Sequence, residues 1–331
     1  MNALPSVSIL IPTYNRAGYV REAIESVARQ DYEGPMEVVV VDDGSTDDTA
    51  EVLQRCVQEY SHLRIIQVDL KREPRTPSAA PARNAGLKKV TGDFVGYLDS
   101  DDLLEPTKIR VQVEALLAHP EADMCTSMWR WFREPQPEHA IKEGGAQVQS
   151  GPLLPGYMDP NGWYIIESAL YRREIVRKAG SWEEDSTWGD DTVWHIKVGL
   201  AGAKNIHLPI VLCSVRMHEG DSFQSAKDTQ QRAEAEVILF QCHDRIAKLM
   251  EEKPEYYEVC RENLVAWYRW DMRRYLKCRF SDLAHLAYLR MLEHQRVLWR
   301  RMGIRAYYRY AQAVSYLRFL VRKHVRRQGS D

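Results

Sequence analysis

Short apolar runs alternate with longer amphipathic segments over the first hundred residues of the chain. The apolar runs are rich in β-branched residues, which predicts buried strands, and the segments between them carry apolar residues at helical spacing. This alternation predicts an α/β fold with right-handed βαβ units and a mostly parallel sheet. The predicted strands are 7–12, 37–41, 63–68 and 93–98, and the predicted helices are 17–30, 46–60 and 80–90.

The pattern becomes less regular after about residue 124. Residues 134–157 are rich in Gly, Pro and Gln and predict a long loop, of the kind that usually serves as a lid or binding loop. A helix is predicted from Asp190 to about residue 200, and a strand over 206–216.

Beyond residue 225 only helical patterns remain, with interruptions near Pro254 and Gly303. The chain of 331 residues is long enough for one large domain or two modest ones. We therefore expect an α/β domain over 1–224 and a helical C-terminal region over 225–331.

Polar clusters follow three of the predicted strands. The carboxyl ends of parallel strands meet at one edge of a sheet, where such sheets bind their ligands. We therefore expect these clusters to converge on one crevice. The clusters are 13–16, 42–47 and 99–102.

Three of the four residues in the last cluster are aspartates, in the order Asp99-Ser100-Asp101-Asp102. Carboxylates on a tight turn suit Mg²⁺ or Mn²⁺, which bind through one or two carboxylates together with substrate phosphates. The same residues are also typical of a solvated acidic turn or a helix N-cap. The cluster by itself leaves both interpretations open.

Other candidate residues also have two interpretations each. Asp43 either belongs to an ordinary turn or accepts a hydrogen bond from a nucleobase. Arg83, near a helix start, either holds a phosphate or base or lies on the surface. Asp190 and Asp191 either cap a helix or supply a general base. His218 is either structural or a ligand of a transition metal.

Composition indicates a globular intracellular protein. Apolar residues make up 44% of the chain and charged residues 28%. The six cysteines show no C-x-x-C pair and no zinc spacing, which favours reduced thiols in a cytoplasm. We see no signal-peptide pattern and no apolar run of about 18 residues, so we expect no membrane-spanning helix.

The charge is divided unequally along the chain. Residues 261–331 carry 17 Lys and Arg against 5 Asp and Glu, within a total net charge of −2. Arginines alternate with aromatic and apolar residues over about 304–327, which suits a helix lying on an anionic membrane and equally a helix packed on the catalytic domain. No nucleic-acid-binding motif accompanies the charge, so we expect no nucleic acid partner.

The order of the motifs resembles that of the family 2 glycosyltransferases, which have the GT-A fold. The resemblance covers about residues 6–222 and is most specific over the first 110. It departs from the family pattern at Asp190, where the family usually has Glu. The matching segments are 8–16, 38–47, 82–86 and 96–105.

The resemblance implies an inverting, metal-dependent transfer of a sugar from a nucleotide-sugar, which we expect to be UDP-linked. The acceptor would be a hydroxyl of a saccharide, a lipid-linked acceptor or another glycoconjugate, in bacterial surface polysaccharide or glycoconjugate synthesis. Such an enzyme would be cytoplasmic and peripheral on the inner face of the plasma membrane.

The resemblance also implies roles for single residues. Pro12, Thr13, Tyr14 and Asp43 would hold the nucleobase, Arg83 would lie near base or phosphate, and Asp99 would contact ribose or metal. Asp101 would bind Mg²⁺ or Mn²⁺, with His218 on the other side of the ion, and Asp191 would be the base, with Asp190 beside it.

Two alternatives belong to other classes of protein. The first is a non-catalytic scaffold with the same fold, which the presence of Asp191 disfavours. The second is a sugar-nucleotidyltransferase, whose Gly-rich loop after the first strand is replaced by Pro12-Thr13-Tyr14-Asn15. Dehydrogenases and P-loop enzymes are disfavoured because neither of their glycine motifs occurs.

Overall fold

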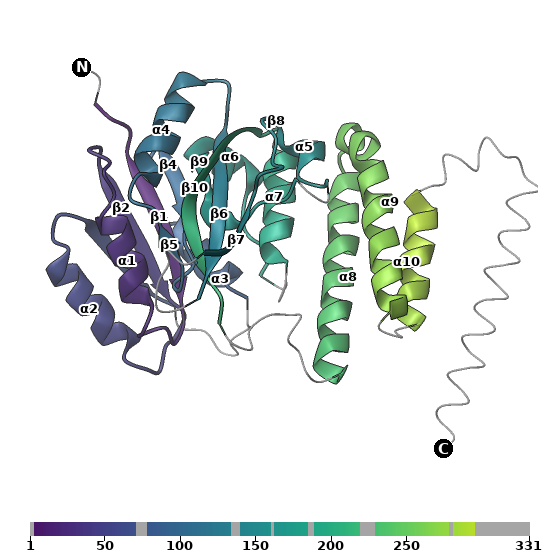
Figure 1. Ribbon diagram of the computed structural model, residues 1–331, viewed down its shortest axis with the longest axis horizontal. Coiled ribbons are helices and arrows are strands. Elements are labelled where there is room, and N and C mark those ends of the chain that lie inside the picture. The colour runs from purple at the N-terminus through teal and green to yellow at the C-terminus, as the bar shows by residue number, and fades with distance from the viewer. Residues whose placement is uncertain are drawn as a thin grey trace, which may run out of the picture. The chain divides into compact units, whose positions relative to one another are not determined.

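A computed structural model of the chain describes residues 3–70, 78–133, 140–159, 162–184, 189–218, 229–277 and 281–294. At its centre is one mixed sheet with helices on both faces (Figure 1). The strands are β1 (Val7–Thr13), β2 (Met36–Asp42), β3 (Arg64–Asp69), β4 (Phe94–Tyr97), β5 (Leu103–Leu104), β6 (Met124–Phe132), β7 (Ala140–Gly144), β8 (Gly151–Pro152), β9 (Ala169–Arg172) and β10 (Lys204–Arg216).

The order of the strands across the sheet is β3-β2-β1-β4-β9-β6-β10-β5, with β7 beside β6 and β8 beside β10. β1 runs parallel to β2 and β4, β2 to β3, and β6 to β10. β9 is antiparallel to both of its neighbours and joins the two parallel groups. The predicted α/β fold with a mostly parallel sheet is confirmed.

The helices pack on the sheet through their apolar residues. In the first helix the buried positions Val20, Ala23, Ile24 and Val27 recur at helical spacing. The helices are α1 (Val20–Ala28), α2 (Thr49–Glu59), α3 (Ala80–Leu87), α4 (Lys108–Ala118), α5 (Leu153–Gly156), α6 (Arg173–Ala179), α7 (Asp190–Leu200), α8 (Thr229–Glu251), α9 (Pro254–Lys277) and α10 (Ser281–His294), with a 3₁₀ turn at Ile166–Ser168.

The close approach of α3 to the sheet depends on a glycine. A Cβ atom added at Gly86 would lie 2.7 Å from Leu10 Cδ1 and 3.0 Å from Val41 Cγ2. Any larger residue would therefore push α3 away from β1 and β2. This gives a physical reason for the glycine that closes the segment 82–86.

The long loop predicted over 134–157 is wrong in part. Ala140–Gly144 forms β7, which pairs antiparallel with β6, and the stretch from Gly151 to Gly156 forms β8 and α5. The backbone of β7 forms hydrogen bonds with β6, although its sequence shows no alternation of apolar and polar residues. Residues 134–139 lie outside the described residues.

The chain divides into two compact units, Met1–Tyr257 and Glu258–Asp331. The predicted boundary at 224/225 falls within 219–228, outside the described residues. In the first unit α8 packs on α7. In the second, Cys260, Leu264 and Tyr268 are buried, and the Tyr268 ring stacks on His294.

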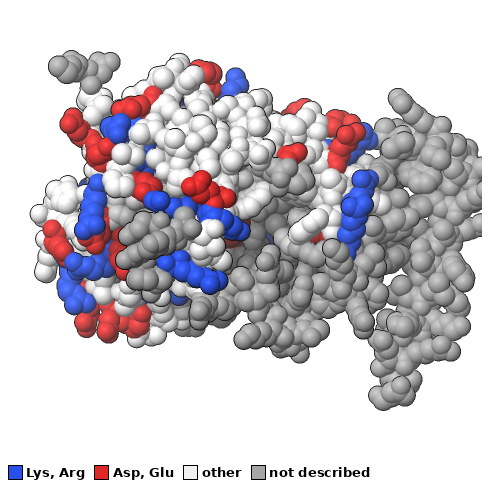
Figure 2. Space-filling view, in the orientation of Figure 1, with Lys and Arg blue, Asp and Glu red and all other residues white. Residues whose placement is uncertain are grey.

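Two further observations concern the surface and the membrane. Figure 2 shows that acidic and basic side chains of the described residues intermingle on the face drawn there, without one patch of a single sign. Among the described helices, none combines the length and the apolarity needed to cross a bilayer. The predicted helix over 304–327 is beyond the part of the chain that the structure describes.

Candidate active site

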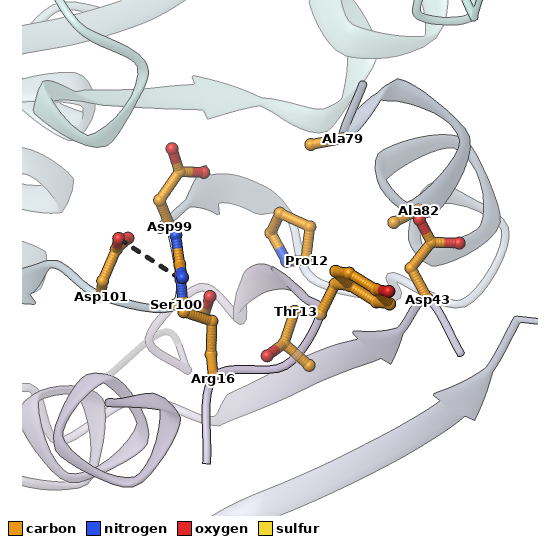
Figure 3. Close-up of a pocket in the computed structure, with 10 residues that line it drawn as sticks. Pro12, Thr13, Arg16, Asp43, Ala79, Ala82, Asp99, Ser100 and Asp101 are labelled. Carbon is orange, nitrogen blue, oxygen red and sulfur yellow. Dashed lines mark ion pairs between the residues drawn. The ribbon is translucent and has the colours of Figure 1, made fainter. Parts of the chain in front are cut away.

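The carboxyl ends of β1, β2 and β4 surround a pocket of about 300 Å³. Figure 3 shows Asp43 on one side of this pocket and Asp99 and Asp101 on the other. The structure therefore brings together the polar clusters that follow these three strands. The pocket is lined by Pro12, Thr13, Tyr14, Arg16, Asp43, Ala79, Ala82, Asp99, Ser100 and Asp101.

Hydrogen bonds between the first two strand ends shape the Asp43 side of the pocket. The backbone N–H of Asn15 donates to Ser45 Oγ at 2.9 Å, and the Asn15 side chain accepts from the backbone N–H of Thr46 at 2.8 Å. The backbone N–H of Asp43 donates to the Thr13 carbonyl at 2.9 Å. Thr13 belongs to the pocket lining, and its buried hydroxyl has no hydrogen-bond partner among the described residues.

Arg83 lies outside the pocket lining and connects Asp99, which lines the pocket, to Asp190 on α7. Its buried guanidinium donates to Asp99 Oδ1 at 2.9 Å and to Asp190 Oδ2 at 3.1 Å, and it lies 4.5 Å from the centre of the Trp182 ring. Burial alone would lower the pKa of Arg83, but the carboxylates of Asp99 and Asp190 raise it above its ordinary value. The structure thus places Arg83 as a bridge between two carboxylates, outside the pocket lining.

Asp101 and His218 meet at the acidic wall of the pocket. Asp101 Oδ2 lies 2.9 Å from His218 Nε2 and 3.6 Å from Arg16 Nε, the ion pair that Figure 3 marks. Both side chains are partly open to solvent, at 19% and 20% exposure. Of the predicted metal ligands, the structure joins these two, whereas the carboxylate of Asp99 is engaged by Arg83. A carboxylate and an imidazole on a pocket wall fit the ligand preferences of Mn²⁺.

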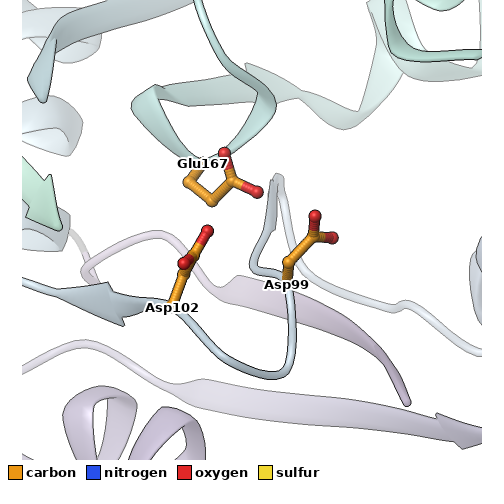
Figure 4. A group of neighbouring side chains, drawn as sticks. All are labelled: Asp99, Asp102 and Glu167. Carbon is orange, nitrogen blue, oxygen red and sulfur yellow. The ribbon is translucent and has the colours of Figure 1, made fainter. Parts of the chain in front are cut away.

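Asp102, from the predicted aspartate cluster, forms a second acidic group with Glu167, which the sequence does not predict as a site residue. Together with Asp99 they offer oxygen atoms that lie within 4.8 Å of one another (Figure 4). Burial, and then the neighbouring carboxylates, raise the pKa of both Asp102 and Glu167 well above the ordinary values. Both are buried, so this group is less accessible to a metal-bound diphosphate than Asp101 and His218.

Arg216 holds residues 99–102, here called the acidic loop, in place through hydrogen bonds. Its Nε donates to the Asp101 carbonyl at 2.9 Å, its backbone N–H to Asp102 Oδ1 at 2.8 Å, and its Nη2 to Glu22 Oε2 at 2.6 Å. The guanidinium lies 4.8 Å from the centre of the Phe132 ring. Sequence reasoning assigned no role to Arg216. The antiparallel pairing of β10 with β5, the strand that follows residues 99–102, brings Arg216 to this loop.

The two aspartates in the first turn of α7 differ in their surroundings. Asp190 is the partner of Arg83 and also accepts from the backbone N–H of Asp191 at 3.0 Å. Asp191 accepts from the backbone N–H of Thr192 at 2.7 Å. Burial, and then the neighbouring Asp190, raise the pKa of Asp191 to about 6, against the opposing effect of Arg83. A carboxylate with such a pKa is suited to accept a proton near neutral pH.

Comparisons with known proteins identify the family of the chain. The sequence profile described as Glycosyl transferase family 2 matches residues 8–180, just over half of the chain. An uncharacterised glycosyltransferase, YibD of Escherichia coli K12, is 28% identical over 203 residues, which cover 57% of this chain and 56% of YibD. A putative teichuronic acid biosynthesis glycosyltransferase, TuaG of Bacillus subtilis, is 32% identical over 116 residues, 35% of this chain and 44% of TuaG. The chain thus spans about half the length of these relatives.

Solved structures show the same fold. Residues 1–349 of Staphylococcus aureus TarS, in complex with UDP-GlcNAc, give a TM-score of 0.56 at 18% identity, covering 84% of this chain and 89% of that one. The mannosyltransferase PcManGT from Pyrobaculum calidifontis, in complex with GDP-Man and Mn²⁺, gives 0.54 at 20% identity, covering 95% and 81%. With the profile match over its N-terminal half and this shared architecture, the chain belongs to the family 2 glycosyltransferases of the GT-A fold.

Proposed function

We propose that the chain transfers a sugar, with inversion, from a nucleoside-diphosphate sugar to a hydroxyl of an acceptor saccharide. The observation that carries this proposal is the bridge from Asp99 through Arg83 to Asp190. It connects the pocket at the carboxyl ends of the strands to a helix start where Asp191 has a raised pKa. The arrangement thus supplies both a donor site and a base for an acceptor.

The donor would occupy the pocket between Asp43 and Asp101. The Asp43 carboxylate and the Thr13 hydroxyl would bind the nucleobase, with Pro12 and Tyr14 beside them, and Asp99 would bind the ribose or the metal. A UDP-linked donor is supported by TarS, which was solved with UDP-GlcNAc, whereas PcManGT was solved with GDP-Man. A surface polysaccharide as product is supported by TuaG, with its putative role in teichuronic acid synthesis.

Asp101 and His218 would hold a Mg²⁺ or Mn²⁺ ion, as the Mn²⁺ in the PcManGT complex supports. When bound, the ion supplies positive charge that stabilises the departing diphosphate. Arg216 would keep the acidic loop in position through the Asp101 carbonyl.

Asp191 would take the proton of the acceptor hydroxyl as its oxygen attacks the anomeric carbon. The new glycosidic bond forms on the face opposite the breaking bond to the diphosphate, and the proton passes to the carboxylate. Asp190, held by Arg83, is not available as a covalent nucleophile. A single displacement without a glycosyl-enzyme intermediate inverts the anomeric configuration.

The acceptor would be a saccharide, free, lipid-linked or part of a glycoconjugate. The excess of 17 Lys and Arg over 5 Asp and Glu in residues 261–331 supports attachment to an anionic membrane surface on the cytoplasmic side.

A screen of nucleotide-sugars by thermal shift, with and without Mn²⁺, tests the proposal. Because a ligand that binds only the folded state stabilises it, one nucleotide-sugar should raise Tm, and more so with Mn²⁺. That donor should then release its nucleoside diphosphate slowly in water and faster with an acceptor. If no nucleotide-sugar shifts Tm or is turned over, the scaffold alternative is favoured. Release of pyrophosphate from a nucleoside triphosphate and a sugar phosphate would favour the nucleotidyltransferase.

A further inference from the structure

Three tryptophans form a partly exposed surface on β6 and on the segment before Tyr164. The Trp129 ring lies 5.5 Å from Trp131 and 5.3 Å from Trp163, measured between ring centres. Trp129 is buried, whereas 45% of Trp163 is exposed. The ammonium of Lys142, on β7, lies 4.1 Å from the centre of the Trp131 ring. We call these four residues the tryptophan platform.

The backbone of β7 holds this surface in place. Gly144 pairs with Trp129 and Lys142 with Trp131 across the β6–β7 ladder. A Cβ atom added at Gly144 would lie 2.5 Å from Trp129 Cε2, so only glycine lets this ring lie against β7. The buried Trp129 ring in turn supports the exposed Trp163 ring. The platform is therefore a fixed surface, with its outer ring facing solvent.

On one side, the strand that carries Trp131 lies next to the strand that supports the acidic loop, residues 99–102. Trp131 pairs with Val215 on the parallel strand β10, and the next residue, Arg216, contacts both Asp101 and Asp102. Because side chains alternate along a strand, Trp131 and Arg216 point to opposite faces of the sheet. Neighbouring strands are about 4.8 Å apart, so Trp131 lies one strand away from the strand that supports this loop.

On the other side, the chain that follows Trp163 packs against the helix that carries the candidate base. Tyr164, the residue after Trp163, packs 4.3 Å from the ring of His195 on α7, the helix that begins with Asp190 and Asp191. Glu167, which lies beside Asp99, is the fourth residue after Trp163. An extended chain of four residues spans at most about 14 Å. A short oligosaccharide can bridge such a distance between the platform and the reaction centre.

We propose that the tryptophan platform binds the acceptor saccharide. This inference rests on the proposed function and specifies where its acceptor is held. The flat face of Trp163 would stack against the C–H face of a sugar ring, because an aromatic ring offers a large apolar surface at little entropic cost. The ammonium of Lys142 would donate to hydroxyl or carboxylate oxygens of the same acceptor. The class of ligand is therefore an oligosaccharide or polysaccharide, bound several sugar units away from the attacked hydroxyl.

A glycan microarray of bacterial surface polysaccharides and their oligosaccharide fragments provides the probes. The wild-type chain should bind at least one glycan. Trp163→Ala should weaken the affinity of the chain for this glycan about tenfold. This is the size of effect expected when one stacked aromatic contact and the apolar area that it buries are lost. Trp163→Phe should retain part of the affinity. Trp270→Ala is the matched control, because Trp270 lies in the second unit, is 55% exposed, and should leave binding unchanged.

Kinetics with the bound glycan as acceptor give a second measurement. Trp163→Ala should raise the acceptor KM and leave kcat and the hydrolysis of the donor in water unchanged, because the platform is remote from the reacting atoms. Wild-type affinity in Trp163→Ala, or an equal loss in Trp270→Ala, would overturn the inference. So would a wild-type chain that hydrolyses the donor but binds no glycan. Absence of donor hydrolysis in every variant would instead count against the proposed function.

Discussion

Arg83 and Asp190 join α3 to α7 through a hydrogen bond of 3.1 Å between Nη1 and Oδ2. Nη2 of the same guanidinium donates to Asp99, which lines the pocket at the strand ends. The planar fork of an arginine can bind two carboxylates at once, which the single ammonium of a lysine cannot do in the same geometry. The two halves of the candidate site are therefore connected by one side chain.

Arg83→Lys should lower kcat by about 10²-fold, because a misplacement of about 1 Å at a reacting group costs that much. The variant should also be less stable, since a buried carboxylate without its partner is costly. Thermal unfolding and steady-state kinetics measure both effects. Arg21→Lys is a matched control, because Arg21 forms an exposed ion pair with Glu59 and its substitution should change neither quantity much. Wild-type kcat in Arg83→Lys would show that the bridge is not needed.

The raised pKa of Asp191 predicts that kcat depends on pH. Below its pKa of about 6 the carboxyl is protonated and cannot accept a proton, so kcat should rise through pH 6 and level off above it. Asp191→Asn should remove this step and lose at least about 10²-fold in kcat while donor affinity is kept. A pH profile of kcat and donor titrations of the variant check both. An inactive Asp190→Asn together with an active Asp191→Asn would reverse the assignment.

Asp101 predicts dependence on a divalent metal. Chelation by EDTA, or Asp101→Ala, should abolish transfer and leave the fold intact, because the lost contribution is stabilisation of the leaving group. His218→Ala should weaken Mn²⁺ binding without abolishing it, which Mn²⁺ titration followed by electron paramagnetic resonance measures. Asp31→Ala serves as a control, because Asp31 forms a surface ion pair with Arg110 and neither residue lines the pocket. Full turnover by Asp101→Ala in metal-free buffer would rule out this role.

The basic C-terminal segment predicts salt-sensitive membrane binding. Each basic residue near an anionic surface contributes about 1 kcal/mol, and salt screens this attraction. Deleting residues 304–331 should therefore reduce sedimentation with anionic liposomes more than it reduces activity on a soluble acceptor. Neutral liposomes and high salt provide the comparison. If the intact chain binds neither kind of liposome at any salt concentration, the alternative of a packed helix is favoured.

The central strands could be predicted from the sequence because they are buried on both faces and therefore consist mainly of apolar residues. β1 and β2 read as nearly continuous apolar runs, and their predicted ends fall within about one residue of the observed ends. β7 was missed because its position depends on pairing with β6, and the five residues of β7 have no strand-like alternation of their own. Pattern alone finds strands that bury their side chains, and it misses strands that are held mainly by a neighbour.

The same limit applies to the candidate site. The strand-end clusters that contain Asp43 and Asp101 could be predicted to meet, because parallel strands end at one edge. The sequence could not show that Asp99 faces Arg83, since neighbouring carboxylates on one turn point in different directions. Glu167 lies in a 3₁₀ turn far along the chain, without a local motif. Only the folded chain brings it within 4.8 Å of Asp99 and Asp102.

Gly86 has a consequence for how the enzyme can move. Arg83 lies three residues before Gly86 on α3, and both are buried. Because Gly86 sets the distance between this helix and β1, it also sets how far the guanidinium reaches toward Asp99 and Asp190. The lack of a side chain at Gly86 thus sets the spacing between α3 and the sheet at the candidate site. Any opening that separated Asp99 from Asp190 would have to break an ion pair of the buried Arg83, so we expect the two carboxylates to move together.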